Sequence, residues 1–135
     1  MQIKSYSFPI VAPIEVISLP TAIADCIAVK FNKVSFKFNE FNKRVLTISL
    51  QSLQTHNNNI FFKGSNINEP YSFIHFHDGS TASINYINTA NTFDLTFDRR
   101  NIVSLDIIAK IDGEYNSLLI SPENPLFISL DFISV

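Results

Sequence analysis

Residues 103–111 read Val-Ser-Leu-Asp-Ile-Ile-Ala-Lys-Ile, and apolar side chains occupy every second position of this run. The residues of that apolar set are Val103, Leu105, Ile107, Ala109 and Ile111, with Ser104, Asp106 and Lys110 among those between them. Since successive side chains of a β-strand point to opposite faces, a period of two is typical of a half-buried antiparallel strand. The run therefore predicts one long strand with its apolar face turned toward a core.

The same alternation extends over most of the chain. Candidate strands, some of which we expect to merge, are 3–8, 14–19, 27–31, 34–38, 45–53, 60–63, 71–77, 82–87, 92–98, 102–111, 117–120 and 126–134. Chains with many strands at this spacing form sandwiches or barrels, because stacking or closing the sheets protects their edges. The sequence predicts an all-β fold: one antiparallel, jelly-roll-like β-sandwich domain over residues 1–135, with an extended N-terminal arm.

Short breaks separate the predicted strands. Residues 39–43 are polar, and residues 64–70 form the longest loop. Asp78-Gly79-Ser80 and Asp112-Gly113-Glu114 have the composition of hairpin turns. The apolar phase changes across Asn32-Lys33, which predicts a turn or a bulge there.

Two segments leave alternatives open. Residues 23–30 fit a strand, but Ile23, Cys26 and Ile27 also have the spacing of a short helix. Residues 1–20 fit an extended arm or an edge strand, because proline cannot donate to a central ladder. The prolines and Glu15 interrupt the apolar stretch 8–24, so we expect neither a signal peptide nor a membrane span, which needs about 20 apolar residues.

Size and composition limit the classes of function. The chain has 135 residues, 46% of them hydrophobic, which suffices for a core without a metal or a disulfide. Charged residues make up only 16%, which suits a surface covered by neighbours, although an AT-rich genome explains the composition equally well. The net charge of −2 gives no electrostatic footprint for nucleic acid. Cys26 is the only cysteine, and its apolar neighbours predict a buried side chain.

One basic stripe alternates with aromatic residues. Its cations are Lys30, Lys33, Lys37, Lys43 and Arg44, and its rings are Phe31, Phe36, Phe38 and Phe41. Such a stripe fits contacts to phosphates or to a single strand through stacking. An ordinary strand pair with its lysines outward and its phenylalanines inward is the favoured interpretation.

The sequence His75-Phe76-His77 is the strongest candidate for chemistry. On a strand both imidazoles point to the same face and reach one metal ion. The motif resembles the His-x-His of cupins, which are double-sheet jelly rolls, but Thr81 stands where cupins carry a glutamate. The remaining histidine, His56, lies upstream rather than on a later strand. We therefore expect no metal and no cofactor, with His75 and His77 as the candidates if a metal binds.

The strand around these histidines is apolar on both faces. Tyr71, Phe73, His75 and His77 share one face, and Ile74 and Phe76 share the other. This predicts a central strand under a second sheet, or a strand that packs against another subunit. The candidate interface residues are Tyr71, Phe73, His75, His77, Ile133 and Val135. An aromatic platform for sugars is the second choice.

Catalytic motifs are missing from the sequence. It contains neither a Gly-x-Ser-x-Gly elbow nor a glycine-rich phosphate loop, and only three glycines in total. Asp94 and Asp98 lie close in sequence to Arg99 and Arg100, but solvated turn charges explain them better than an acid–base pair. We expect the protein not to be an enzyme.

The C-terminal third resembles the end of small viral jelly-roll capsid proteins. The resemblance rests on residues 100–107, on Asp112-Gly113-Glu114 and on residues 125–132, which together read as a long strand, an acidic glycine turn and a closing strand. It covers about a quarter of the chain and supplies no catalytic residues. It implies a structural subunit of a virus particle, such as a minor capsid, penton or cement protein.

That resemblance also implies partners and a location. We expect a homo-oligomer that contacts other virion proteins, without a nucleic-acid or membrane partner. It would be made in the host cytoplasm without a signal peptide and be found in the virion. The alternative is a ligand-binding β-sandwich, either with a cupin-like metal site at His75 and His77 or as a carbohydrate-binding module.

Overall fold

The computed structural model describes residues 1–53, 72–90 and 92–135. Within these ranges the chain forms β1 (Gln2–Ile10), β2 (Ile14–Lys37), β3 (Arg44–Leu50), β4 (Phe73–His77), β5 (Ser83–Ile87), β6 (Leu95–Ile111) and β7 (Leu126–Ser134). One turn of 3-10 helix, η1 (Gln51–Leu53), follows β3. The all-β prediction is confirmed. No helix in the described ranges has the length and apolarity to cross a membrane.

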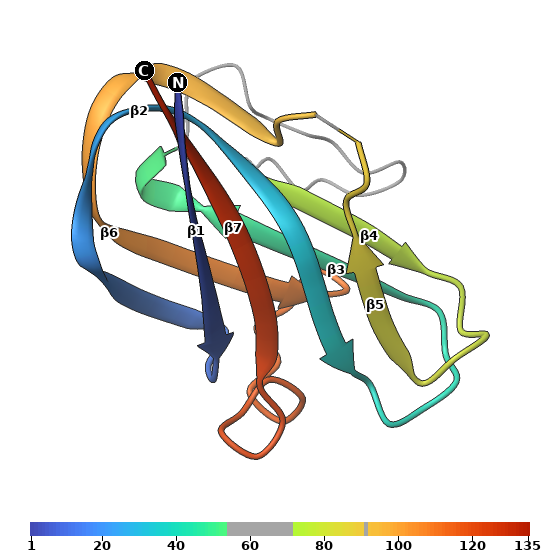
Figure 1. Cartoon of the computed structure of the whole chain (residues 1–135). Coiled ribbons are helices and arrows are strands. Elements are labelled where there is room, and N and C mark those ends of the chain that lie inside the picture. The colour runs from blue at the N-terminus through green and yellow to red at the C-terminus, as the bar shows by residue number, and fades with distance from the viewer. Residues whose placement is uncertain (54–71, 91) are drawn as a thin grey trace.

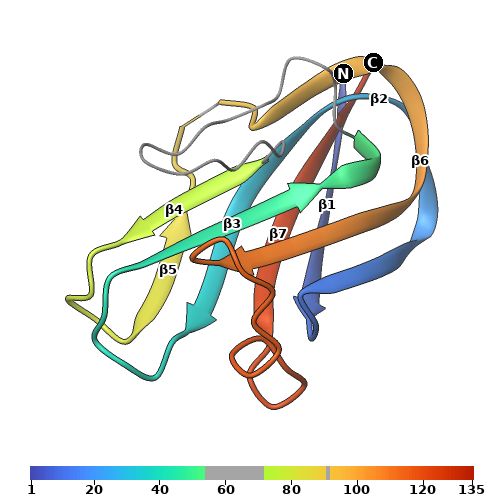
Figure 2. The same ribbon diagram turned by 180° about the vertical axis from the view of Figure 1, so that it is seen from behind.

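All seven strands belong to one antiparallel sheet with the order β1-β7-β2-β6-β3-β4, and β5 pairs with β2 beside this path. The sheet curls into a half-barrel (Figure 1). β1, β7, the second half of β2 and β5 lie on one side of it, and β3, β4 and the end of β6 lie on the other (Figures 1 and 2). We call the outward surface of the first group the front face.

The curl follows from the two long strands. The first part of β2 pairs with residues 104–108 of β6, and its later part pairs with β7 and β5. Between these parts the ladder shifts register three times from Ser18 to Ala28, and Asp25 has a φ of 55°. Bulges of this kind bend a strand and increase its twist. Residues 23–30 are therefore bent strand, not helix.

Bonds to Asp25 hold this bend in place. The backbone N–H of Asp25 donates to Asn101 Oδ1 at 3.1 Å, and its carbonyl accepts from the N–H of Val135 at 3.1 Å. The C-terminus is thereby joined to the bend. A further register shift separates Phe31 from Lys33 in the pairing with β7, which confirms the bulge predicted at Asn32-Lys33.

Residues 1–20 do not form an arm that leaves the sheet. Residues 2–10 pair with β7 over their whole length, and β1 is the edge of the sheet. Pro9, which has no N–H to donate, is tolerated in such an edge strand. Residues 14–20 belong to β2. Of the other predicted strands, 117–120 is a turn and 60–63 lies outside the described residues.

The two predicted hairpin turns differ in outcome. Ile111 and Glu114 exchange both backbone hydrogen bonds around Asp112 and Gly113, whose φ values of 54° and 79° fit a type I′ turn, so this prediction is confirmed. The turn at residues 78–80 joins β4 to β5, but β4 pairs with β3 and β5 pairs with β2. It is therefore not a hairpin, because its two strands enter opposite sides of the curl.

The core fills the hollow of the half-barrel. Its largest fully buried side chains are Phe31, Phe38, Phe132, Ile10, Ile23, Leu46, Ile48, Leu50, Ile84, Leu105, Ile107 and Ile111. Cys26 is fully buried as predicted, and burial raises the pKa of its thiol. Removal of this apolar surface from water is the main stabilising term of the fold.

Candidate functional site

The strand with the two histidines turns one face into the core. Phe73 and His77 on β4 are only 5% and 7% exposed, while His75 is half-buried. The His77 ring lies 5.1 Å from the Phe38 ring, and the His75 ring lies 6.4 Å from that of Tyr86 on β5. Residues of the same chain thus fill the space that this face borders.

Hydrogen bonding assigns a role to His77. Its Nε2 lies 2.7 Å from the carbonyl oxygen of Thr81, which accepts only, so Nε2 carries the proton and donates it. The rings of His75 and His77 are 6.3 Å apart, and burial followed by the charge of His77 lowers the pKa of His75. Within the described residues no group of three or more His, Cys, Asp or Glu side chains is placed to hold a metal ion. His56 lies outside those residues.

The six candidate interface residues occupy different environments. Phe73 and His77 face inward, and Ile133 is also buried. Val135 is exposed at the C-terminus, and Tyr71 lies outside the described residues. On the other face of β4, Phe76 is 67% exposed and Ile74 is half-buried.

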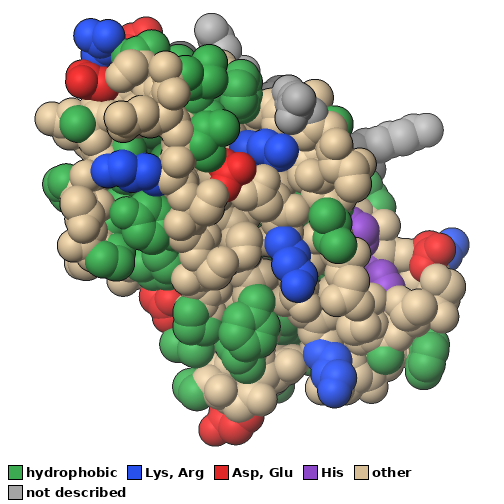
Figure 3. Space-filling view, in the orientation of Figure 1, with side chains coloured by type: hydrophobic (Ala, Val, Ile, Leu, Met, Phe, Trp, Pro, Cys, Tyr) green, Lys and Arg blue, Asp and Glu red, His purple; other side chains and the backbone are tan. Residues whose placement is uncertain are grey.

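The side chains of the basic stripe on β2 point alternately into the core and to the outside. Phe31, Phe36 and Phe38 are buried, while Lys33 and Lys37 are exposed on the front face. Figure 3 shows basic side chains along the course of β2, with apolar side chains beside them. The lysines-outward interpretation therefore holds on β2. Arg44 belongs to another site, where it pairs with Glu40 and, at 2.7 Å, with Asp112.

The charges at the start of β6 have structural partners. Asp94 Oδ2 accepts from the backbone N–H of Phe31 at 2.6 Å, and burial raises the pKa of this carboxyl group. Arg99 Nε lies 3.8 Å from Asp25 Oδ1, and the guanidinium of Arg100 lies 4.9 Å from the ring centre of Phe97. The first two contacts tie this end of β6 to β2, the third lies within β6, and all three agree with structural roles for the charges.

The front face has an aromatic side chain at its centre. Phe127 on β7 lies opposite Ser35 of β2 on one side and Pro9 of β1 on the other. It is 52% exposed, although Leu126 and Ile128 beside it are buried. The sequence carries one signal for this site, an apolar residue at an outward-facing position of residues 126–134, and Phe127 was not among the predicted site residues.

Polar side chains surround Phe127 in register. Ser35 lies opposite Asn85 on β5, and its hydroxyl donates to the Asn85 side-chain oxygen at 3.4 Å. In the next row Ser129 lies opposite both Ser7 and Lys33, and the two serine hydroxyls are 2.8 Å apart. The face thus presents hydroxyl, amide and ammonium groups around a ring.

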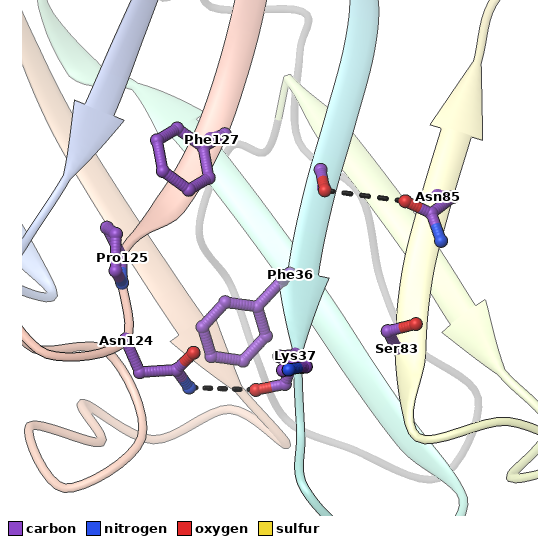
Figure 4. A pocket seen from close by; sticks show the side chains of 8 residues that line it. Phe36, Lys37, Ser83, Asn85, Asn124, Pro125 and Phe127 are labelled. Carbon is purple, nitrogen blue, oxygen red and sulfur yellow. Dashed lines mark hydrogen bonds between the residues drawn. The ribbon is translucent and has the colours of Figure 1, made fainter.

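Two shallow hollows flank the ring. One, of about 280 Å³, extends toward β5 and is lined by Ser35, Phe36, Lys37, Ser83, Asn85, Asn124, Pro125 and Phe127 (Figure 4). The other, of about 450 Å³, extends toward β1 and is lined by Ser7, Phe8, Pro9, Lys33, Ser35, Phe127, Ile128 and Ser129. Because both include Ser35 and Phe127, they form one surface that crosses the front face.

A second surface lies on the first part of β2. Ile14 and Val16 occupy alternate positions and are 61% and 65% exposed. Their partners on β6 are Ile108, which is half-buried, and Asp106. We call these four residues the β2–β6 patch, in which Asp106 carries the one charge.

Neither the front face nor the β2–β6 patch can be assigned by likeness to a known protein. Comparison of the chain with protein-family models, with curated proteins and with solved structures gives no match.

Proposed function

We propose that this protein is a non-catalytic structural subunit that works through contacts with further copies of itself and with other proteins. The observation that carries the proposal is the β2–β6 patch. Exposed Ile14 and Val16 lie next to Ile108, and covering such neighbouring apolar side chains with protein removes their surface from water. A sheet of this kind offers a rigid surface for such a contact.

The finer form of the proposal is a jelly-roll-like sandwich subunit of a virus particle. Contacts of Phe73 on β4 with Phe31 on β2 and Tyr86 on β5 support two facing layers. The order of long β6, type I′ turn and closing β7 supports the likeness to capsid jelly rolls. In this form the partners are virion proteins and the location is the particle.

Sedimentation of the purified protein tests self-association. We expect wild-type protein to sediment as an oligomer, and the variant Ile14→Asp/Val16→Asp to sediment as a folded monomer, because two buried unpaired charges oppose the contact. Phe76→Asp is the matched control, since Phe76 is equally exposed but lies on β4. A wild-type monomer at high concentration, or an unchanged oligomer in the double variant, would refute the role of the patch.

The particle assignment has a separate test. If the particle assignment is right, the protein co-purifies with intact particles at fixed stoichiometry. The purified protein should also convert no small compound. A carbohydrate-binding module is the second candidate function, and one observation favours it: Phe127 stands exposed among hydroxyl and amide side chains.

A further inference from the structure

We infer that the front face around Phe127 is a binding site for an acidic sugar chain, independently of any self-association through the β2–β6 patch. The two hollows that share Phe127 and Ser35 give a continuous surface from β1 to β5. A sugar ring needs an apolar surface for its C–H face and polar groups for its hydroxyls. Phe127 supplies the first, and Ser35, Asn85 and Ser129 supply the second.

The charge of the ligand follows from two lysines. Lys33 and Lys37 flank Ser35 on the same face of β2, and each lines one of the two hollows. Phe127 is the direct cross-strand neighbour of Ser35, so both lysines are its diagonal neighbours, within reach of long side chains. Among the described residues neither lysine forms an ion pair. Two unneutralised ammonium groups on either side of a ring favour carboxylate or sulfate groups on the sugar.

The same surface fits a nucleic-acid strand less well. Stacking of successive bases needs a row of exposed rings, but Phe31, Phe36 and Phe38 of the stripe are buried and leave Phe127 alone at the centre of the face. The chain also carries a net charge of −2, so it has no extended basic surface that could follow a continuous phosphate backbone, and the positive charge on this face is the local charge of Lys33 and Lys37.

A glycan array with acidic glycans and their neutral counterparts tests the inference on the full chain. We expect binding to glycans with sialic acid, uronic acid or sulfate and not to the uncharged counterparts. Amide shifts in NMR spectra recorded with the best-bound glycan should map to Ser35, Asn85, Phe127 and Ser129. No bound glycan, or a preference for neutral glycans, would overturn it.

Matched variants separate the site from general electrostatics. Lys33→Ala/Lys37→Ala should weaken binding by roughly tenfold or more, because each lost charged hydrogen bond removes a sizeable share of the affinity. Lys4→Ala/Lys43→Ala removes the same charge outside the two hollows and should leave binding unchanged. Phe127→Ala should also weaken it, while Phe76→Ala should not. Equal losses in both lysine pairs, or tighter binding of oligo-dT than of any glycan, would overturn the inference.

Discussion

The ring of Phe73 on β4 lies 5.3 Å from the ring of Phe31 on β2, although these two strands share no backbone hydrogen bonds. The same ring lies 5.0 Å from that of Tyr86 on β5. Phe73 therefore connects β4, the last strand in the sheet order, to β2 and β5 on the opposite side of the half-barrel. Side-chain packing, not a backbone ladder, holds the half-barrel closed on this side.

Phe73→Ala should lower the free energy of unfolding by about 3–5 kcal/mol, as expected for truncation of a buried aromatic residue. Phe76→Ala on the same strand should change it by no more than about 0.5 kcal/mol, because Phe76 is exposed. Urea denaturation followed by circular dichroism measures both values. Similar losses in the two variants would contradict the assignment of faces on β4.

Gly79→Ala should lower the free energy of unfolding by about 1–3 kcal/mol. Gly79 has a φ of 84°, and a Cβ there would lie 2.9 Å from the backbone carbonyl carbon of Asn42. Gly113→Ala is the control, since Gly113 has a similar φ of 79° in the type I′ turn between Ile111 and Glu114. If thermal unfolding shows equal losses, the approach to Asn42 does not restrict position 79.

Acidification should destabilise the fold through His75. Its pKa is lowered in the folded state by burial and by His77, so the unfolded state binds the proton more tightly. The contribution of neutral His75 to the free energy of unfolding is fully present above about pH 6.5, the ordinary pKa of histidine. It is lost as the pH falls toward the lowered pKa of the folded state. His75→Gln should reduce this pH dependence in urea denaturation between pH 5 and pH 7. An unchanged slope would exclude His75 as the cause.

Asp94 should show the opposite linkage. Burial raises the pKa of its carboxyl group, so protonation favours the folded state, and its contribution grows as the pH falls through the raised pKa. At pH 7 Asp94→Asn keeps an oxygen for the N–H of Phe31 without a buried charge, and should be at least as stable as wild type. Asp94→Ala leaves that N–H unpaired and should lose about 1–2 kcal/mol in the same assay. Equal stability of the two variants would show that the bond to Phe31 does not matter.

Local patterns predicted the strands and most of their faces, because side-chain alternation reports directly on burial. Leu105, Ile107, Ala109 and Ile111 are buried as predicted. Val103 is exposed instead, and its neighbour Ile102 is buried opposite Ile23, where the register of β2 and β6 shifts. The alternation of buried and exposed side chains on β6 changes at this register shift, and no local pattern in residues 103–111 indicates the change.

The sequence also did not predict which strands pair with one another, because local patterns do not report on partners that are distant in sequence. Asp78-Gly79-Ser80 has the composition of a hairpin turn, yet β4 and β5 pair with different strands. The phase change at Asn32-Lys33 predicted a turn or a bulge, and did not decide between them; in the structure β2 continues through this position as a bulged strand. The hollows beside Phe127 combine residues of β1, β2, β5 and β7, whose adjacency exists only in the folded chain.

The 24 residues of β2 belong to both sides of the half-barrel, which limits how the molecule comes apart. If β2 detaches, the pair β1-β7 is separated from β6-β3-β4, and β5 loses its one ladder among the described residues, so we expect the two sides to open together. Amide hydrogens of β2, β6 and β7 should then exchange with deuterium at one common, slow rate set by global opening. Ladders that join residues as distant in sequence as Ile3 and Ile133 also imply slow refolding, since the long loops between such residues must close before these contacts form.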